Sequence, residues 1–243
     1  MHPHTETIQS EAGLIYRLRC GQPQRGQPQR GQLQRGQPRH GLIVMLHGLS
    51  GDENVMWIFE HALPRSATVI APRALYASEL GGYSWVRSVV RDDLDGADFH
   101  EAIDNLSRLV NEVIPLYQVD PQRVILMGFS QGAALSYALS LAQPDRLRGV
   151  IALAGFLPQH SSTPLRSAQS ALPYYLIIHG THDEAVPIDR ARAARSVLEG
   201  YGAAVECHEH HVGHKVSAQG MQEMARWIDK TLAYSSPRAA TSG

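Results

Sequence analysis

Gly128-Phe129-Ser130-Gln131-Gly132 follows the apolar run Val124 to Met127 and precedes a helix-like stretch, Ala133 to Ala142. This order predicts a strand, a tight turn and a helix, with Ser130 on the turn. A serine held on such a strained turn needs glycine two positions before and two positions after it, as here. The pattern is that of a nucleophile elbow, which exposes the serine hydroxyl above a sheet and puts the Gln131 N–H at a helix N-terminus. The competing interpretation is a serine that serves only the turn.

A nucleophilic serine needs a base, and the base needs an acid that orients it, downstream in the order acid then histidine. The apolar strand Tyr174 to Ile178 leads into His-Gly-Thr-His-Asp-Glu-Ala-Val-Pro, in which Asp183 is the candidate acid. Glu184 is expected to point to the other side of the loop. Asp189 is expected to cap the following helix, Arg190 to Leu198.

The candidate base is His214, which follows a strand from Ala203 to His210 and precedes a helix from about Ser217 to Leu232. His208, His210 and His211 are rivals, but His208 and His210 share one face of the strand and precede the loop. We expect these three to be surface or hydrogen-bonded histidines. A zinc site in this His-rich stretch is disfavoured, because no further shell of ligands is evident.

A second donor for an oxyanion is expected after the first long core strand, Leu42 to Leu46. His47-Gly48-Leu49 follows that strand, and the backbone N–H of Leu49 would pair with that of Gln131. Read alone, this segment also fits an ordinary glycine-rich turn.

Five segments in order resemble the carboxylesterase, phospholipase and acyl-protein thioesterase family of small α/β-hydrolases: LHGLSGDE, GGYSWV, GFSQGAALS, HGTHDEAVP and HVGHKVS. The resemblance covers roughly residues 42 to 232. It implies an α/β-hydrolase fold, a triad of Ser130, Asp183 and His214, and oxyanion donors at Leu49 and Gln131. Ser50 departs from the glycine usual in the thioesterase branch, and Gly81 to Trp85 is closer to the bacterial esterases.

The remaining pattern alternates strands with helices, which predicts a mostly parallel central sheet with helices on both faces. The longest helix is expected over Asp98 to Tyr117, with Asp98 as a possible cap. Only Gly155 to Leu172 separates two strands after the elbow helix, so no cap domain is expected. The loop from Arg73 to Leu94 is then the remaining cover, and Tyr83 and Trp85 are candidate substrate-binding residues, although they would equally serve to seal the core.

The 243 residues are 43% hydrophobic, enough for one full core, and no change of composition divides the α/β-hydrolase domain expected over 13–234. The formal net charge of −1 predicts no nucleic-acid partner. Cys20 and Cys207 match no metal or redox spacing, so reduced thiols are expected. With no signal-peptide pattern and no run of about 18 apolar residues, we expect a cytoplasmic protein without stable membrane insertion, as a monomer or homodimer.

Residues 21–40 repeat Gly-Gln-Pro-Gln-Arg with small variations, and they are too polar to bury. We expect a flexible insertion, and the alternative is a basic tether for a polyanion. Residues 1–12 and 235–243 are expected to be flexible as well.

The predicted function is a cofactor-independent serine hydrolase that cleaves small-molecule esters of small to medium acyl groups through an acyl-enzyme, with no metal. Lysophospholipase or acyl-protein thioesterase activity is the alternative within the enzymes. A non-enzymatic binding module that uses the arginine repeat is the alternative of another class. A peptidase is disfavoured, because no second domain would select peptides.

Overall fold

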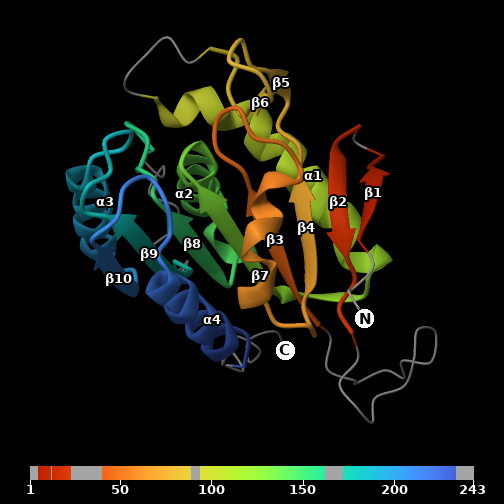
Figure 1. Cartoon of the computed structure of the whole chain (residues 1–243). Coiled ribbons are helices and arrows are strands. Elements are labelled where there is room, and N and C mark those ends of the chain that lie inside the picture. The colour runs from red at the N-terminus through yellow and green to blue at the C-terminus, as the bar shows by residue number, and fades with distance from the viewer. Residues whose placement is uncertain (1–4, 12, 23–39, 89–93, 162–171, 234–243) are drawn as a thin grey trace.

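The computed structural model describes residues 5–11, 13–22, 40–88, 94–161 and 172–233. Within these ranges, eight strands form one sheet in the order β1-β2-β4-β3-β7-β8-β9-β10 (Figure 1). Their bounds are β1 (Glu6–Gln9), β2 (Ile15–Arg19), β3 (His40–Leu46), β4 (Thr68–Pro72), β7 (Val119–Phe129), β8 (Gly149–Leu153), β9 (Tyr174–Gly180) and β10 (Val205–His210). The six strands from β4 to β10 are parallel, and β2 is antiparallel to both of its neighbours. The predicted mostly parallel sheet is confirmed.

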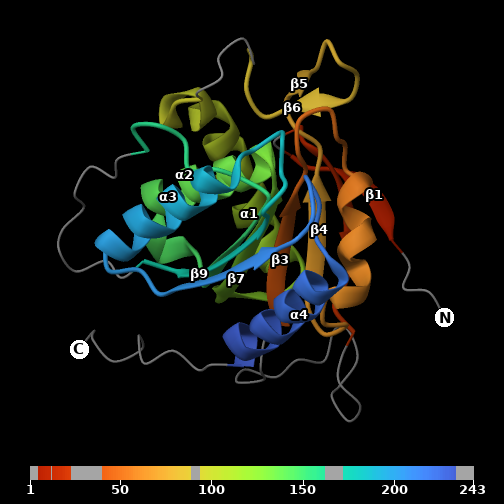
Figure 2. The same ribbon diagram turned by 60° about the vertical axis from the view of Figure 1, so that its left-hand side comes forward.

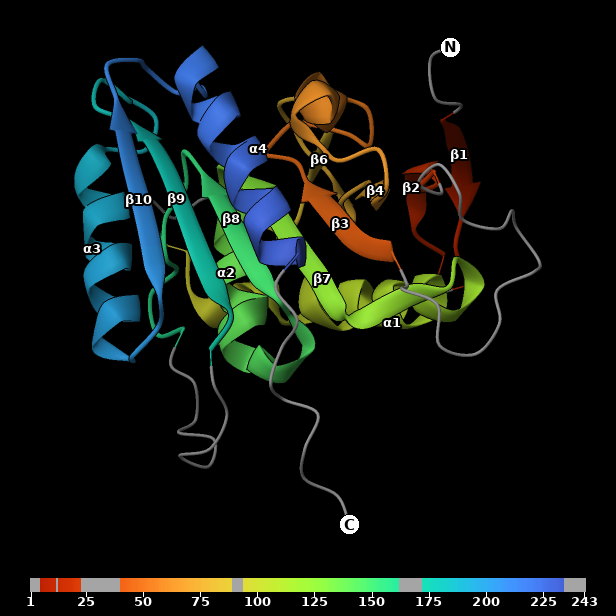
Figure 3. The ribbon, with the colours of Figure 1, turned by 90° about the horizontal axis from the view of Figure 1, so that it is seen from below.

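Helices cover both faces of the sheet, as the sequence predicts (Figure 3). On one face lie α1 (His100–Leu116), α2 (Gln131–Ala142) and α3 (Ile188–Gly200); on the other lie the 3₁₀ helix η1 (Val55–Ala62) and α4 (Ala218–Ala233). Central strands face both layers: in β3, Leu42 and Val44 pack toward the first layer, and Ile43 and Met45 toward the second. Strands buried on both faces must be apolar throughout, which is why their sequence does not alternate.

The small hairpin of β5 (Tyr76–Ala77) and β6 (Tyr83–Ser84) lies apart from the main sheet, beyond the carboxyl ends of its parallel strands (Figure 2). The 3₁₀ helix η2 (Gly96–Phe99) leads into α1, and η3 (Pro144–Arg146) follows α2. This arrangement puts the hairpin next to the loop that follows β3 and, through Ser84, next to Gln131 at the start of α2.

The structure differs from the sequence prediction at both helix caps. Asp95 is the residue whose side chain accepts from Ala97 N–H, and Asp98 is its partner in a reciprocal capping box, so the helical segment starts earlier than predicted. Asp189 does not cap α3: Pro187 is the residue before that helix, and the exposed Asp189 carboxylate lies 3.3 Å from Arg192 Nη1. Proline preorganises the entry to α3 without a capping side chain.

The N-terminal segment also differs from the prediction, because residues 6–9 form the edge strand β1. These residues are held in place by antiparallel pairing with β2, which the composition of the segment does not reveal. Residues 23–39 of the repeat and residues 234–243 of the tail lie outside the described residues, so the predictions for them stay predictions.

Between β8 and β9, the described residues 154–161 and 172–173 form no helix, and residues 162–171 lie outside the described ranges. The two cysteines are not joined to each other. In the described part of the chain, no helix has the length and apolar character needed to cross a membrane.

The turn between β7 and α2 requires glycine for steric reasons. A Cβ atom on Gly132 would lie 2.1 Å from Leu46 O, and one on Gly128 would lie 2.2 Å from Gly132 O. Both contacts are with backbone, which cannot rotate away. The two glycines therefore let β7, α2 and the end of β3 approach closely.

Gly132→Ala is expected to lower the free energy of unfolding by at least about 2 kcal/mol, because the new methyl group must displace backbone of β3. Gly200→Ala is the matched control, since a Cβ atom there would meet nothing within 4 Å. Urea unfolding of both variants measures the difference. Equal stability of the two variants would contradict the close approach.

Candidate active site

Ser130 is the single residue between β7 and α2, and its backbone has φ 53° and ψ −115°. Its N–H donates to Leu153 O at 2.9 Å, and its carbonyl accepts from the N–H groups of Ala133 and Ala134. A positive φ strains a residue with a side chain, so the flanking hydrogen bonds must hold the turn. The strain is typical of an elbow that exposes a serine hydroxyl.

Asp183 and His214 are joined by a hydrogen bond of 2.7 Å between His214 Nδ1 and Asp183 Oδ2. The Asp183 side chain is fully buried, and the His214 side chain is partly exposed. The other carboxylate oxygen, Oδ1, accepts from Ala185 N–H at 3.0 Å and from Val186 N–H at 2.8 Å. Three hydrogen bonds thus fix the orientation of the carboxylate toward the imidazole.

The loops that carry these two residues are bonded to each other. Thr181 N–H donates to His210 O at 2.8 Å, and His182 N–H donates to Val212 O at 3.0 Å. On the other side, the ring of His214 lies 4.9 Å from the ring of Phe129, the residue before Ser130. The three predicted residues are therefore gathered at the carboxyl ends of β7, β9 and β10, where parallel α/β sheets bind their ligands.

The rival histidines are paired elsewhere. His208 Nε2 lies 2.9 Å from Glu206 Oε1, His210 Nε2 lies 2.9 Å from Glu223 Oε2, and the His211 ring packs edge-on against His182 at 3.9 Å. None of these contacts involves Asp183.

The loop after β3 packs against the elbow. A Cβ atom on Gly48 would lie 3.2 Å from Ser130 Cβ, so Leu49 follows directly beside the serine. Gln131 is the first residue of α2. Among the described residues, neither the Leu49 N–H nor the Gln131 N–H donates to another protein group. Two unpaired N–H groups on either side of a serine are what an oxyanion requires.

Comparison with known proteins decides the family. The model of the phospholipase/carboxylesterase family matches residues 33–232. The chain belongs to this family. Family membership makes the protein a hydrolase, and the architecture described above is the α/β-hydrolase fold.

Relatives of this phospholipase/carboxylesterase family member differ in name. The acyl-protein thioesterase 1 of Debaryomyces hansenii is 28% identical, over 80% of this chain and 93% of its own. A rice protein named "Probable inactive carboxylesterase" is 29% identical, over 80% of this chain and 86% of its own. The crystal structure of a carboxylesterase from Mesorhizobium loti is similar with a TM-score of 0.75, at 20% identity and with 93% and 98% of the two chains covered, which shows the fold.

Of the two roles predicted for Trp85, the structure of this family member favours the one in which the side chain seals the core. Its side chain is 1% exposed and donates from Nε1 to His47 O at 2.8 Å. Its backbone N–H donates to Gln131 Oε1 at 2.9 Å. Trp85 therefore connects the loop after β3 to the start of α2. An aromatic residue in a loop sequence fits a wall or a support equally well, and here burial decides for the support.

His47 completes this support. Its Nε2 accepts from Ala74 N–H at 3.0 Å, so Nδ1 carries the proton and donates to Gly48 O at 2.7 Å. Burial lowers the pKa of His47, which keeps the ring neutral and this tautomer in place. The ring orients the Gly48 peptide, which precedes Leu49.

Tyr83, the other candidate from the sequence, does not line the cavity described below, and its role in substrate binding stays a prediction. Its backbone N–H donates to Gly51 O, and its carbonyl accepts from Ser50 N–H, both at 2.9 Å. Arg73 donates to the Tyr83 hydroxyl at 3.2 Å and forms a two-pronged ion pair with Glu53, with both distances 2.7 Å. The Arg73 guanidinium holds the pKa of Glu53 below its usual value. Tyr83 thus fixes Ser50 and Gly51 through its backbone, and Arg73 connects its hydroxyl to Glu53.

A cavity of about 520 Å³ opens beside His214 and the Leu49 loop. Its wall comes from the loop after β3, from η1 and from the start of α4: Gly48, Leu49, Ser50, Gly51, Val55, Met56, Ile58, Phe59, Phe129, His214, Lys215, Val216 and Met221. Most of these side chains are apolar. The contribution of η1 to this wall is not among the sequence predictions; the apolar Met56 and Phe59 in a short segment after Asp52 are the sequence signal for it.

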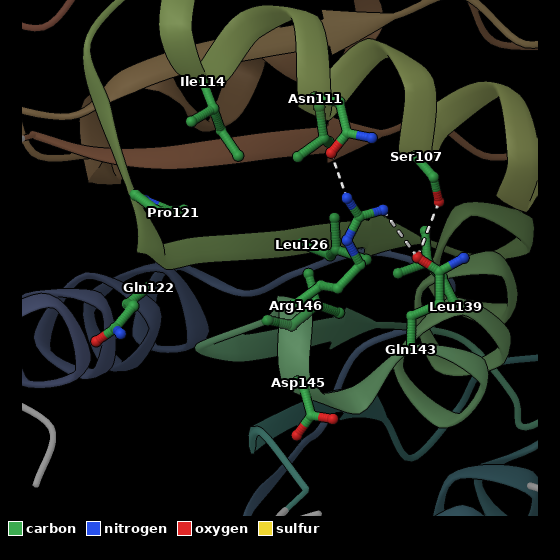
Figure 4. A pocket seen from close by; sticks show the side chains of 12 residues that line it. Ser107, Asn111, Ile114, Pro121, Gln122, Leu126, Leu139, Gln143, Asp145 and Arg146 are labelled. Carbon is green, nitrogen blue, oxygen red and sulfur yellow. Dashed lines mark hydrogen bonds between the residues drawn. The ribbon is translucent and has the colours of Figure 1, made fainter. Parts of the chain in front are cut away.

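In the described ranges, no three His, Cys, Asp or Glu side chains are placed to hold a metal ion. A second cavity, of about 380 Å³, lies near the start of β7, at the opposite end of that strand from Ser130 (Figure 4). Its polar side chains bond one another: Arg146 donates to Asn111 and Gln143, and Ser107 donates to Gln143. These contacts tie α1 to η3 and α2.

Proposed function

We propose that this hydrolase is a carboxylesterase that acts through Ser130, His214 and Asp183. The observation that carries the proposal is the 2.7 Å bond from His214 Nδ1 to a buried Asp183 whose other oxygen is held by two backbone N–H groups. Such a bond leaves Nε2 of His214 as the basic nitrogen. A histidine with no catalytic role at the surface is not expected to bond a carboxylate that is fully buried.

In the proposed mechanism, His214 Nε2 takes the proton of Ser130 as its hydroxyl attacks the ester carbonyl. The Leu49 and Gln131 N–H groups stabilise the oxyanion, aided by the N-terminus of α2. His214 then gives the proton to the departing alcohol. Water hydrolyses the acyl-enzyme by the same sequence of proton transfers and releases the acid. No cofactor enters these steps.

The cavity beside His214 is proposed to take the acyl group. Its volume of about 520 Å³ and its apolar wall suit an alkyl chain of small to medium length. Among the described residues, its wall comes mainly from the loop after β3, η1 and the start of α4. Small-molecule esters with such acyl groups are therefore the proposed substrates, reached directly from solvent.

The test is hydrolysis of p-nitrophenyl esters from acetate to laurate. kcat/KM is expected to rise from acetate to medium chains by up to about fourfold for each methylene group buried, and then to level off. Rates are expected to follow a simple saturation curve through the solubility limit of the ester. A sharp rise at that limit would indicate activation at a lipid surface and would contradict direct access.

Met221→Trp narrows the cavity, because Met221 is a half-buried part of its wall. This variant is expected to lose activity on the medium-chain esters and to keep its activity on acetate. Val197→Trp, at an exposed position on α3, is the matched control, with an unchanged profile expected. Equal loss on all esters in Met221→Trp would contradict the acyl assignment.

Thioester hydrolysis is the second candidate, favoured by the Debaryomyces relative that is named an acyl-protein thioesterase. The same groups would cleave a thioester, since the attacked carbonyl and the oxyanion are alike. Parallel assays with oxygen-ester and thioester substrates of the same acyl group compare the two activities.

We also propose a cytoplasmic location, supported by two cysteines that are not joined to each other.

A further inference from the structure

We propose that His179 is a positioning residue for the reaction, which holds the Asp183 carboxylate in the orientation that bonds His214. This inference rests on the proposed function. His179 lies in β9, four residues before Asp183, and both side chains are fully buried. Neither the family match nor the serine chemistry assigns a role to this imidazole.

The contacts of His179 form a closed unit with the loop that carries Asp183. His179 Nε2 lies 2.8 Å from Val186 O and 3.4 Å from Asp183 Oδ2. Val186 N–H in turn donates to Asp183 Oδ1 at 2.8 Å. Val186 is therefore held at its carbonyl by His179 and at its N–H by Asp183. Rotation of the carboxylate would break the bond from Val186 N–H to Asp183 Oδ1. Val186 cannot move with the carboxylate, because its carbonyl is held by His179.

The tautomer of His179 follows from these partners. A carbonyl oxygen only accepts, so Nε2 must carry the proton. The same Nε2–H group lies near Asp183 Oδ2, with 3.4 Å between the nitrogen and the oxygen, which is also the oxygen that His214 Nδ1 bonds. Burial lowers the pKa of His179, which keeps the ring neutral. A neutral donor supports the carboxylate without introducing a second cation that would compete with protonated His214.

The other ring nitrogen provides an independent argument. His179 Nδ1 is buried and has no hydrogen-bond partner among the described residues. An unpaired buried acceptor is unfavourable, and a phenylalanine or leucine would fill the same space without one. The feature that distinguishes an imidazole from an apolar ring here is its Nε2–H group, which donates to Val186 O and lies 3.4 Å from Asp183 Oδ2.

The experiment compares His179→Gln, whose amide N–H reaches toward the same position, with His179→Phe, which keeps the bulk and removes the donor. Tyr175→Phe is the control: it removes a buried hydroxyl, bonded to Ser140 Oγ at 2.9 Å, from the same strand. For each protein, kcat and KM for a p-nitrophenyl ester are measured. The downfield proton resonance of His214 Nδ1–H, which His214→Ala identifies by its loss, is recorded without substrate.

His179→Phe is expected to lower kcat by roughly 10- to 100-fold at unchanged KM and to shift or broaden the His214 resonance. His179→Gln is expected to keep most of the wild-type kcat and a His214 resonance close to that of the wild type. Tyr175→Phe is expected to lower the melting temperature but to leave kcat and the resonance unchanged. A folded His179→Phe with wild-type kcat and an unchanged resonance would overturn the role of His179, as would a glutamine variant no better than phenylalanine. If the esterase proposal itself fails, even the wild-type protein lacks turnover, and the resonance still decides whether His179 orients the pair.

Discussion

Ser130→Ala is expected to lower kcat for ester hydrolysis by about 10⁴- to 10⁶-fold, because the other members of a triad cannot act without the nucleophile. The fold should be unaffected. The serine side chain is half-buried, and the hydrogen bonds of its turn come from the backbone, which alanine retains. Activity is measured at enzyme concentrations high enough to detect the residual rate.

Ser136→Ala is the matched control for this variant. Ser136 lies in α2, the helix that follows Ser130, and its hydroxyl donates to Gly132 O at 2.9 Å, so the control removes a comparable group close to the elbow. Its kcat is expected to stay within about threefold of the wild-type value, since it touches no reacting atom. Residual activity of Ser130→Ala within tenfold of the wild type would exclude Ser130 as the nucleophile.

His214→Ala is expected to have an effect of similar size, and Ser130→Ala/His214→Ala should be no worse than either single variant. Residues that act as one unit lose their contribution together, so their effects do not add. In this protein, His214 is the histidine bonded to the buried carboxylate by way of Nδ1. The kcat values of the two single variants and the double variant measure the coupling.

The neighbouring histidines provide the controls. His208→Ala and His211→Ala should keep kcat within about threefold of the wild type, because these side chains pair with Glu206 and His182. Collapse of activity in His211→Ala, with His214→Ala tolerated, would move the base to another position in the loop.

The sequence was sufficient for the sheet and for the meeting of Asp183 with His214. Strand ends in a parallel sheet share one edge, so three residues that each follow a predicted strand are brought together by topology alone. Glycine spacing around Ser130 was equally informative, because steric exclusion of a side chain is a local property of the turn.

Properties that depend on packing could not be predicted in this way. For Trp85 and Tyr83 the sequence left a cavity wall and a core seal open as alternatives; in the structure the first is buried against His47 and the second holds the Ser50–Gly51 backbone. An exposed loop aromatic and a buried one have the same sequence pattern. Likewise, the contribution of η1 to the cavity wall depends on how a short segment folds over the loop after β3. The role proposed for His179 depends on the distances from its Nε2 to Val186 O and to Asp183 Oδ2.

The central claim is that Ser130 forms a covalent acyl-enzyme, and mass spectrometry of the protein after reaction with a fluorophosphonate tests it most directly. Trypsin releases residues 124–146 as one peptide, which contains Ser130, Ser136 and Ser140. We predict one phosphonyl adduct per chain, located by fragmentation on Ser130 and absent from both the Ser130→Ala variant and the heat-unfolded protein. No adduct on an active wild-type enzyme, or an adduct on a different residue, would contradict the account.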